Sequence, residues 1–290
     1  MQKQRMLVTG GSGYLGDWVV RLAKARWDVT ATYCHSRGKQ AGVMWRQLDI
    51  RDAGAVSSLV EDLRPAVVVH TAATNPGPVP DYAGVNVRGT RHVAQVAACV
   101  GARLVHLSTD VIFDGEDAPY VEADAPNPIT AYGRSKARAE AEVRASGADA
   151  VMVRTSLIYG WRPRLDRQTR WVLGGLHDGD PPRLFADEFR CPIWVKSLAA
   201  TLLELAERPT IPAVLNVAGA QRLSRYDFGV RLARFHGADP TAIISASSRQ
   251  SGLTRPLDCT LDCSQAKALL ETPLPGVDAV LGAHATAPKP

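Results

Sequence analysis

Tyr132 and Lys136 lie four positions apart and are residue types that could transfer a proton. At this spacing two side chains share one face of an α-helix, a single turn apart. An ammonium group beside a phenol favours the phenolate and would lower the pKa of the phenol toward neutrality. Thr109 follows the apolar stretch 104–107 and could present its hydroxyl to the same place. A hydroxyl, a phenol and an ammonium that converge are what the reduction of a carbonyl group requires.

A Tyr-x-x-x-Lys pair alone is a weak signal, because a surface lysine often lies over an aromatic ring. The expected neighbouring elements strengthen the prediction that this pair is catalytic. The stretch 104–107 is expected to be a buried strand, which would bring Thr109 to its carboxyl end. The Ala- and Glu-rich segment from 131 to about 146 is expected to be the helix that carries Tyr132 and Lys136.

A glycine-rich segment follows the first expected strand, residues 6–9. Gly10, Gly13 and Gly16 have the G-x-x-G-x-x-G spacing of a dinucleotide fingerprint, and a helix is expected over 14–26. Glycines let the backbone turn tightly and approach a pyrophosphate, which then rests on the N-terminus of the helix. The residues predicted to contact the cofactor here are Gly10, Ser12, Gly13, Tyr14 and Leu15.

The segment after the second expected strand, 28–33, indicates which cofactor is used. A cofactor with a free ribose 2′-hydroxyl usually meets Asp or Glu at this place, and the sequence has neither. Ser36 and Arg37 offer a hydroxyl and a guanidinium, which suit a 2′-phosphate. The sequence therefore favours NADP(H) over NAD(H).

Two further strand ends are predicted to complete the cofactor site. Asp49 and Ile50 follow strand 44–48, and the carboxylate could accept a hydrogen bond from the adenine amino group. Small residues follow the strand 66–70, where they would let a flat cofactor lie close to the backbone. These are Thr71, Ala72, Ala73 and Thr74. Asn86, within an expected helix over 81–100, is predicted to tie backbone segments together near the site.

The alternation of strands and helices up to residue 154 predicts an α/β fold. Its sheet would be a doubly wound parallel (Rossmann) sheet with the site at the carboxyl ends of the strands. The alternation is lost after Gly160. We expect an NADP-binding Rossmann domain over 1–160, with a return segment at about 190–220. Residues 161–290 are expected to form mainly a smaller, substrate-binding lobe.

The 290 residues carry a formal net charge of +5, and 46% of them are hydrophobic. A mild positive charge fits an anionic small molecule such as a phosphorylated cofactor or substrate. No block of Lys and Arg with interleaved aromatic residues is present, so no nucleic-acid partner is expected. No apolar run of about 18 residues is present either, so no membrane span is expected.

The five cysteines and seven histidines show no common metal-ligand spacing, so no metal site is expected. Residues 1–5 lead directly into the first expected strand and leave no room for a signal peptide. Scattered, reduced thiols and the lack of a leader point to the cytoplasm.

These motifs together resemble the extended short-chain dehydrogenase/reductases, and most of all their dTDP-4-dehydrorhamnose reductase branch. The resemblance is specific in the first and middle parts of the chain and weaker at Asp187-Glu188, Cys191-Pro192 and Arg255-Pro256. The segments that carry it are Val8 to Gly16, Ser108 to Gly115, Tyr120-x-Glu122-x-Asp124-x-Pro126, Tyr132 to Lys136, and Arg154-Thr155-Ser156.

The resemblance implies a role for each matching residue. Tyr132 would protonate the new hydroxyl group, and Lys136 would tune Tyr132 and hold the nicotinamide ribose. Thr109 would donate a hydrogen bond to the keto oxygen. The implied substrate is a nucleotide-activated sugar with a 4-keto group, and a homodimer would also fit. The residues expected to contact this substrate are Thr109, Val111, Phe113, Leu157, Arg190 and Arg255, with the two arginines at its diphosphate.

Two departures from the branch leave the sugar open. Leu157 stands where these reductases commonly have Trp, and Val111 stands where they usually have Tyr. Val111 also argues against the related dehydratases, which need Asp-Glu directly after the active-site Thr. The nucleotide, the stereochemistry of reduction and the oligomeric state are not specified by the sequence either.

Two alternatives remain open within the resemblance. Epimerases of the family hold NAD tightly, and the residues after the second strand do not favour NAD. The regulatory subunit of methionine adenosyltransferase resembles the same branch and works mainly by association. The intact Thr109, Tyr132 and Lys136 favour an enzyme over such a regulator.

Overall fold

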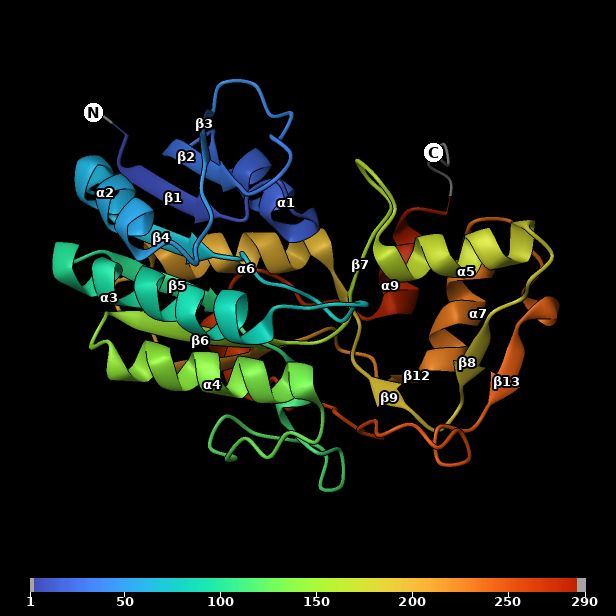
Figure 1. Ribbon diagram of the computed structural model, residues 1–290. Coiled ribbons are helices and arrows are strands. Elements are labelled where there is room, and N and C mark those ends of the chain that lie inside the picture. Colours follow the sequence, from blue (N-terminus) through green and yellow to red (C-terminus); the bar gives the residue numbers. More distant parts are fainter. Residues whose placement is uncertain (1–2, 286–290) are drawn as a thin grey trace. The chain divides into compact units, whose positions relative to one another are not determined.

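Figure 1 shows a computed structural model of the chain, which describes residues 3–285. Its internal contacts divide the chain into two units, each built from separate segments. Unit 1 comprises Met1–Ile112, Ala131–Arg154 and Ala199–Leu215. Unit 2 comprises Phe113–Thr130, Thr155–Leu198 and Asn216–Pro290.

Unit 1 is built on a seven-stranded sheet with the order β11-β6-β5-β4-β1-β2-β3. The pairings from β3 through β6 are parallel, and β1 lies between β2 and β4. The chain therefore moves outward in both directions from β1, as in a doubly wound sheet, and the predicted fold class is confirmed. The strands are β1 (Arg5–Thr9), β2 (Asp28–Tyr33), β3 (Met44–Gln47), β4 (Val67–His70), β5 (Arg103–Leu107), β6 (Ala150–Thr155) and β11 (Val214–Val217).

Helices cover both faces of this sheet (Figure 1). Helices α2 (Ala53–Leu63), α3 (Thr90–Val100) and α4 (Ala131–Ala145) lie side by side on one face, and α1 (Tyr14–Ala23) and α6 (Val195–Glu207) lie on the other. Strand residues such as Leu7, Val68 and Leu104 are fully buried in the core under α2 and α3. Burial on both faces explains why these strands read as continuous apolar runs.

The helix expected over 81–100 consists of two parts. A π-helical segment, η1 (Tyr82–Gly89), comes first and leads directly into α3. Asp81 caps the segment, because its side chain accepts a hydrogen bond of 2.7 Å from the backbone N of Gly84. π-helical turns are rare and often lie at functional sites. This one carries the buried side chain of Asn86.

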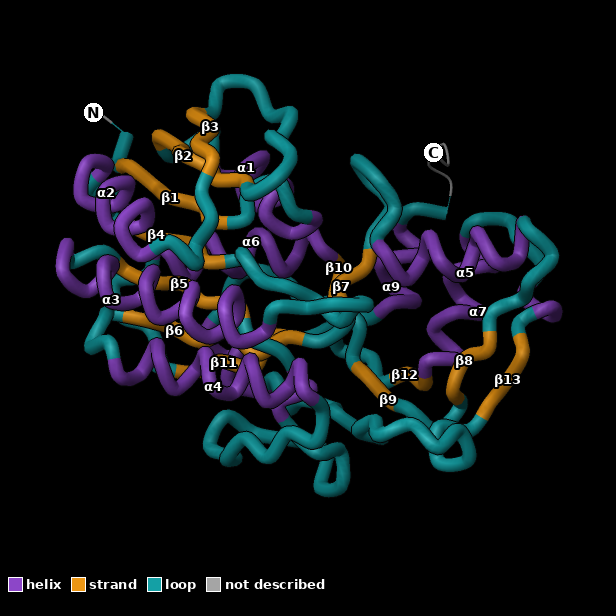
Figure 2. Tube along the Cα trace, viewed as in Figure 1, coloured by secondary structure: helices purple, strands orange, loops and turns teal. Residues whose placement is uncertain are grey.

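Within the described residues, unit 2 combines short strands with four α-helices and a 3₁₀ turn, η3 (Pro240–Ala242). Three two-stranded pairings are present, β10–β7, β12–β9 and β13–β8, and Figure 2 shows these strands as short segments between long loops. Its core includes an aromatic cluster of Tyr159, Trp161 and Phe228. The elements are β7 (Ile158–Tyr159), α5 (Arg167–His177), β8 (Arg183–Phe185), β9 (Phe189–Arg190), β10 (Ile193–Trp194), β12 (Leu223–Ser224), α7 (Arg225–Phe235), β13 (Ile244–Ala246), α8 (Ser264–Leu269) and α9 (Val277–Ala283).

No helix within residues 3–285 is both long and apolar enough to cross a membrane.

Candidate active site

The glycine-rich turn between β1 and α1 is held by close backbone contacts. Gly10 has a φ of 68°, and a Cβ there would lie 2.7 Å from the backbone of Ala72. A Cβ on Gly16 would lie 2.2 Å from the carbonyl oxygen of Gly10. The N-cap of α1, Gly13, makes no side-chain capping hydrogen bond. Because Gly13 has no side chain, the cap residue itself leaves room for a phosphate group at this helix N-terminus.

The segment after β4 lies against this turn and is tied to two helices. Thr71 Oγ1 donates a hydrogen bond of 2.8 Å to the carbonyl oxygen of Thr9. Asn86 accepts from the backbone N of Thr74 at 2.8 Å and donates to the Thr74 carbonyl at 3.1 Å. Asn86 also donates to Ser135 Oγ at 2.9 Å. The prediction that Asn86 ties backbone near the site is confirmed.

The residues predicted to recognise the adenosine half of the cofactor differ in their surroundings. Ser36 and Arg37 are exposed in the loop after β2. Ile50 is buried, at 4% exposure. Asp49 is engaged by Arg51, whose Nε and terminal nitrogen donate at 3.0 and 2.6 Å. These hydrogen bonds lower the pKa of Asp49, so a contact with adenine would share an already paired carboxylate.

Thr109, Tyr132 and Lys136 all belong to unit 1. Thr109 lies between β5 and a 3₁₀ turn, η2 (Asp110–Ile112), and its Oγ1 donates to Asp110 at 3.3 Å. Tyr132 and Lys136 lie one turn apart at the start of α4. Lys136 is buried, and its Nζ donates a hydrogen bond of 2.7 Å to the Leu107 carbonyl, next to Ser108 and Thr109. The β5 end and the α4 start are therefore joined through this lysine.

The expected lowering of the Tyr132 pKa is wrong. Burial raises the pKa of the phenol well above its ordinary value, and the charge of Asp110 and the phenol of Tyr82 act in the same direction. Burial also lowers the pKa of Lys136 to about 8, although the carboxylate of Glu140 opposes the shift. Spacing alone predicts an attraction between charges, but Lys136 is buried and Tyr132 is half-buried, and loss of water contact favours the neutral form of each group. Tyr132 therefore holds its proton at neutral pH, as a proton donor must.

A buried ion pair lies directly behind Lys136 and was missed from the sequence. Glu140 follows Lys136 by one turn of α4 and is fully buried. It accepts from Ser108 Oγ at 2.6 Å and from the Arg154 guanidinium at 3.0 and 3.2 Å. The cluster joins β5, β6 and α4. The i, i+4 relation of Lys136 and Glu140 was the available signal.

Tyr82 and two histidines are further neighbours that the sequence did not single out. The Tyr82 ring lies 5.9 Å from that of Tyr132. His70 and His106 are buried, paired in register on β4 and β5, and stacked at 5.3 Å. Lys136 is among the charges that lower the pKa of both histidines, after burial itself. A histidine at the last position of β4 and at the last but one of β5 was the signal that could have indicated them.

The residues predicted to contact the substrate are divided between the units. Thr109 and Val111 belong to unit 1, with Val111 in η2, and the other four candidates belong to unit 2. Phe113 is fully buried and stacks on Tyr120 at 4.1 Å, so its ring is committed to the core of unit 2. Leu157 packs against the aromatic cluster that includes Trp161.

The contacts of Arg190 and Arg255 argue against their expected role at a diphosphate. Arg190 is 3% exposed, and its guanidinium donates to the Pro256 carbonyl at 3.0 Å. It lies 3.2 Å from Glu188, which also accepts two hydrogen bonds from Arg255 at 2.6 and 3.0 Å. Because both cations hold one buried carboxylate, the structure gives no support to a diphosphate contact.

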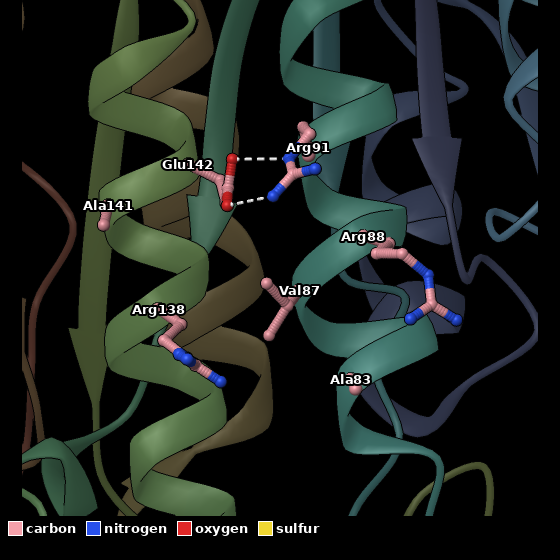
Figure 3. A pocket seen from close by; sticks show the side chains of 7 residues that line it. All are labelled: Ala83, Val87, Arg88, Arg91, Arg138, Ala141 and Glu142. Atoms are coloured by element: carbon pink, nitrogen blue, oxygen red, sulfur yellow. Dashed lines mark hydrogen bonds and ion pairs between the residues drawn. The ribbon is translucent and has the colours of Figure 1, made fainter.

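A surface groove of about 430 Å³ lies between η1–α3 and α4 (Figure 3). Arg91 donates two hydrogen bonds to Glu142 there, each of 2.7 Å. None of the predicted site residues lines this groove, so it is not part of the candidate active site. Its lining consists of Ala83, Val87, Arg88, Arg91, Arg138, Ala141 and Glu142. Among residues 3–285, no group of three or more His, Cys, Asp or Glu side chains could hold a metal ion.

The family model described as "RmlD substrate binding domain" matches residues 4–285. The chain belongs to this family. The RmlD-type fold is shared by a solved hypothetical dTDP-4-dehydrorhamnose reductase from Sulfolobus tokodaii, with a TM-score of 0.82 and 30% identity over 96% of this chain and 98% of that one. A dTDP-4-dehydrorhamnose reductase from Bacillus anthracis, solved with NADP, has the same fold at 23% identity, with a TM-score of 0.83 and coverage of 97% and 98%.

Two curated relatives of this RmlD-family chain carry different names. A Haloferax volcanii protein named "Probable low-salt glycan biosynthesis reductase Agl14" is 33% identical over 263 residues, which cover 86% of this chain and 85% of that protein. The methionine adenosyltransferase 2 subunit beta of Pongo abelii is 30% identical over 279 residues, covering 92% and 82%. The chain is thus similar both to a reductase and to a subunit of another enzyme.

Proposed function

We propose that the chain is an NADPH-dependent reductase that converts the 4-keto group of a nucleotide-activated deoxysugar into a hydroxyl. The observation that carries this proposal is the position of Tyr132 one turn from Lys136 on α4, with the Lys136 ammonium held at the end of β5 by the Leu107 carbonyl. A phenol that keeps its proton at neutral pH can deliver it to an oxygen on which negative charge develops. Family membership and the name of the Haloferax relative support the same reaction class.

The residues around β1 and β2 fit a dinucleotide with a 2′-phosphate. The uncapped N-terminus of α1 and the backbone around Gly10 would hold the pyrophosphate, and the exposed Ser36 and Arg37 would hold the 2′-phosphate. The segment Thr71 to Thr74 lies against Gly10 and would line the same cofactor. When bound, a reduced nicotinamide supplies a hydride.

Three side chains of unit 1 would bind the keto oxygen, donate the proton and hold the nicotinamide ribose. Thr109 would donate a hydrogen bond to the keto oxygen, and Tyr132 would give that oxygen its proton. Lys136 would hold the nicotinamide ribose with its ammonium group, which the Leu107 carbonyl fixes in place. Stabilising charge as it develops on the oxygen lowers the barrier, because this interaction is stronger in the transition state than in the substrate.

Two residues of the predicted substrate site bear on the identity of the sugar. Val111 and Leu157 are smaller than the aromatic residues that the resembling reductases place there. A sugar or sugar-like ketone different from that of the rhamnose pathway would fit this change. Arg190 and Arg255 are left out of the proposed site because of their contacts with Glu188.

A second candidate function is a regulatory subunit that binds NADP without turning it over. The similarity to methionine adenosyltransferase 2 subunit beta over 92% of the chain favours it. The two functions differ in one observable, namely whether NADPH is consumed together with a keto substrate.

The test measures NADPH oxidation with dTDP-4-keto-6-deoxysugars and mass spectrometry of the product. We expect turnover by the wild type and a fall of about 10²–10⁴-fold in Tyr132→Phe, which keeps the ring and loses only the hydroxyl. Tyr226→Phe in unit 2 serves as the matched control and should keep full activity. Wild-type levels of turnover in Tyr132→Phe would overturn the assignment. NADPH binding with no oxidation on any keto sugar would favour the regulatory subunit.

A further inference from the structure

The outer face of α5 in unit 2 exposes a large aromatic side chain. Trp171 is 50% exposed, although it lies near the middle of the helix. Most buried indoles contribute large apolar areas to a core, so an indole left half in water is a candidate contact for a partner. Trp171 shares its helix face with Arg167, four positions before it, and is adjacent to Arg170.

Four exposed arginines lie close to this indole in the sequence. Arg162 and Arg164 in the preceding loop are exposed, as are Arg167 and Arg170 on the helix. The segment 161–177 has a single acid, Asp166, which is 2% exposed and caps the helix through the backbone N of Thr169 at 2.9 Å. The exposed acids Asp178 and Asp180 follow only beyond the C-terminal end of α5. The surface therefore combines one apolar anchor with several guanidinium groups.

Gly174 lies on α5 three positions after Trp171 and has no packing reason to be glycine. A Cβ at this position would meet no atom within 4 Å, and its φ is not one that requires glycine. Glycine inside a helix lowers its stability relative to alanine, so an unforced glycine calls for another reason. Because Gly174 has no side chain, nothing projects from this position beside the indole, and the backbone of a binding partner can approach closely.

The face is also held rigidly. Asp166 accepts hydrogen bonds from Thr169 Oγ1 at 2.5 Å and from the backbone N of Gly160 at 3.1 Å. The inner face of α5 buries Val172 completely, in a core cluster with Leu184 on β8 and Ala233 on α7. A pre-organised surface loses little conformational entropy on binding.

We propose that the outer face of α5 is a docking surface for an acidic protein segment that carries an apolar or aromatic side chain. Carboxylates of the segment pair with Arg167, Arg170 and the arginines of the preceding loop. Its apolar side chain covers Trp171, and its backbone passes over Gly174. Trp and Arg are the residue types in which binding energy concentrates at protein interfaces. The proposal is independent of the reductase assignment, because α5 carries none of the residues placed in that site.

Single-stranded nucleic acid would also be attracted to a basic surface, but the arrangement favours a protein. Platforms for single strands stack successive bases on several aromatic rings along a basic groove. The exposed large hydrophobic side chains within the described residues are Met44, Val79, Val121, Trp171 and Leu253, and only Trp171 is aromatic. A single exposed ring beside a glycine can bind one side chain of a protein segment, and the backbone of that segment can pass close to the glycine.

The test measures binding of the full chain to fluorescein-labelled polymers by fluorescence anisotropy. The probes are a glutamate–tyrosine copolymer, poly-L-glutamate of matched length and a single-stranded oligodeoxynucleotide. We expect the copolymer to bind at least about tenfold more tightly than poly-L-glutamate, which offers no side chain for the indole. Trp171→Ala should abolish that difference, and Arg167→Ala with Arg170→Ala should weaken both acidic polymers in a salt-dependent way.

Two further variants separate docking from general charge and from misfolding. Gly174→Leu should block the copolymer while the thermal midpoint stays the same or rises, because a side chain there meets open space. Arg46→Ala on β3 and Leu253→Ala, both at exposed positions elsewhere, should bind like the wild type. Equal affinity of Trp171→Ala and wild type for the copolymer would refute the proposal. Tighter, Trp171-dependent binding of the oligonucleotide would also refute it and would assign the face to nucleic acid.

Discussion

At the scale of single residues, burial decides the chemistry of the candidate site more than spacing does. The four-residue interval between Tyr132 and Lys136 is visible in the sequence and places both on α4. Their charge states follow from removal from water: the phenol keeps its proton, and the pKa of the ammonium falls to about 8. In the proposed reaction, Tyr132 would act as a neutral acid beside a lysine whose pKa is lowered to about 8.

The buried ammonium of Lys136 predicts a pH-dependent cost to folding. Its pKa is about 8 in the folded chain against an ordinary value of 10.5, so the unfolded chain binds more protons between these pH values. The cost is fully present below pH 8 and disappears as the pH rises to 10.5. We expect Lys136→Met to raise the free energy of unfolding at pH 7 by about 1–3 kcal/mol, after the lost hydrogen bond to Leu107 is counted.

Urea unfolding at pH 7 and pH 10 measures this effect in the absence of cofactor. The gain of Lys136→Met should shrink at the higher pH, and the exposed Lys267→Met should show no such dependence. A loss of stability at pH 7 would mean that the ammonium stabilises the fold.

Arg37 carries the prediction on cofactor choice. Its exposed guanidinium follows β2, where an acid would select a free ribose hydroxyl. Losing a charge-assisted phosphate contact costs about 1.5–3 kcal/mol, so Arg37→Ala should weaken NADPH roughly tenfold or more and leave NADH nearly unchanged. Calorimetric titration of both cofactors measures this, with Arg46→Ala as the control. An equal loss for both cofactors would show that Arg37 acts on the fold instead.

The sequence identified residue positions well and residue contacts poorly. Local sequence motifs contain four of the predicted site residues, Gly10, Thr109, Tyr132 and Lys136. Each of them lies at the element predicted for it. Arg190 was predicted to reach a diphosphate because it lies near a proline and a positively charged lobe suits a nucleotide sugar. Nothing near it in the sequence shows that its guanidinium meets a carbonyl group more than sixty residues away. Long-range contacts of this kind are not encoded in spacing.

At the scale of elements, the parallel strands were predictable and the π-helical turn was not. The strands read as apolar runs that end in small or polar residues, and this pattern follows from burial on both faces. The segment 82–89 contains two glycines, two valines and an asparagine, which are weak helix formers, but this composition does not specify a π-turn. Its π-turn accompanies the hydrogen bonds of Asn86 to Thr74 and Ser135, which join segments distant in sequence.

The stacked histidines of β4 and β5 predict that acid destabilises this part of the sheet. Burial, reinforced by Lys136, lowers the pKa of His70 to about 3, so its unfolded form gains a proton first as the pH falls below 6.5. By pH 5, His70 alone should cost about 2 kcal/mol of stability. His106 adds to this loss, because burial lowers its pKa as well.

Replacement of His106 isolates its share of the acid sensitivity. Both of its ring nitrogens are buried without a hydrogen-bond partner among the described residues, whereas His70 lies 2.6 Å from Thr9 Oγ1 and 3.1 Å from Thr90 Oγ1. Because an apolar side chain removes an unmet need for hydrogen bonds, His106→Leu should keep or raise stability at pH 7 and reduce its loss toward pH 5. Thermal unfolding followed across this pH range measures both. A marked loss at pH 7 would show that the imidazole has a stabilising partner.

At the scale of the whole molecule, the two units depend on different buried charges. Unit 1 contains the Glu140 cluster behind Lys136, and unit 2 contains Glu188 between Arg190 and Arg255. Burial opposes ionisation of Glu188, but the hydrogen bonds of Arg255 and the charge of Arg190 outweigh it and hold the pKa of the carboxyl below its usual range. The sequence showed the loss of the strand–helix alternation after Gly160. It did not show that this carboxylate organises the later segments.

Glu188→Gln should therefore weaken unit 2 selectively. The substitution keeps the shape of the side chain but leaves the buried guanidinium of Arg190 without its counter-charge. Breaking a buried ion pair typically costs about 3–5 kcal/mol, and the carbonyl groups that Arg190 also contacts should hold the loss near the lower figure. Glu142→Gln is the matched control, because its partner Arg91 is 44% exposed and such surface pairs contribute about 1 kcal/mol or less.

Hydrogen–deuterium exchange in increasing urea can assign the loss to a unit. In Glu188→Gln we expect protection to disappear at lower urea in residues 155–198 and 216–285, while β1, β4 and β5 of unit 1 keep their wild-type protection. Such selective loss requires that the buried ion pair stabilises unit 2 and that unit 1 folds on its own core of Leu7, Val68 and Leu104. A simultaneous loss of protection in both units would show that they unfold as one. Equal midpoints for the Glu188 and Glu142 variants would show that the buried pair contributes no more than an exposed one.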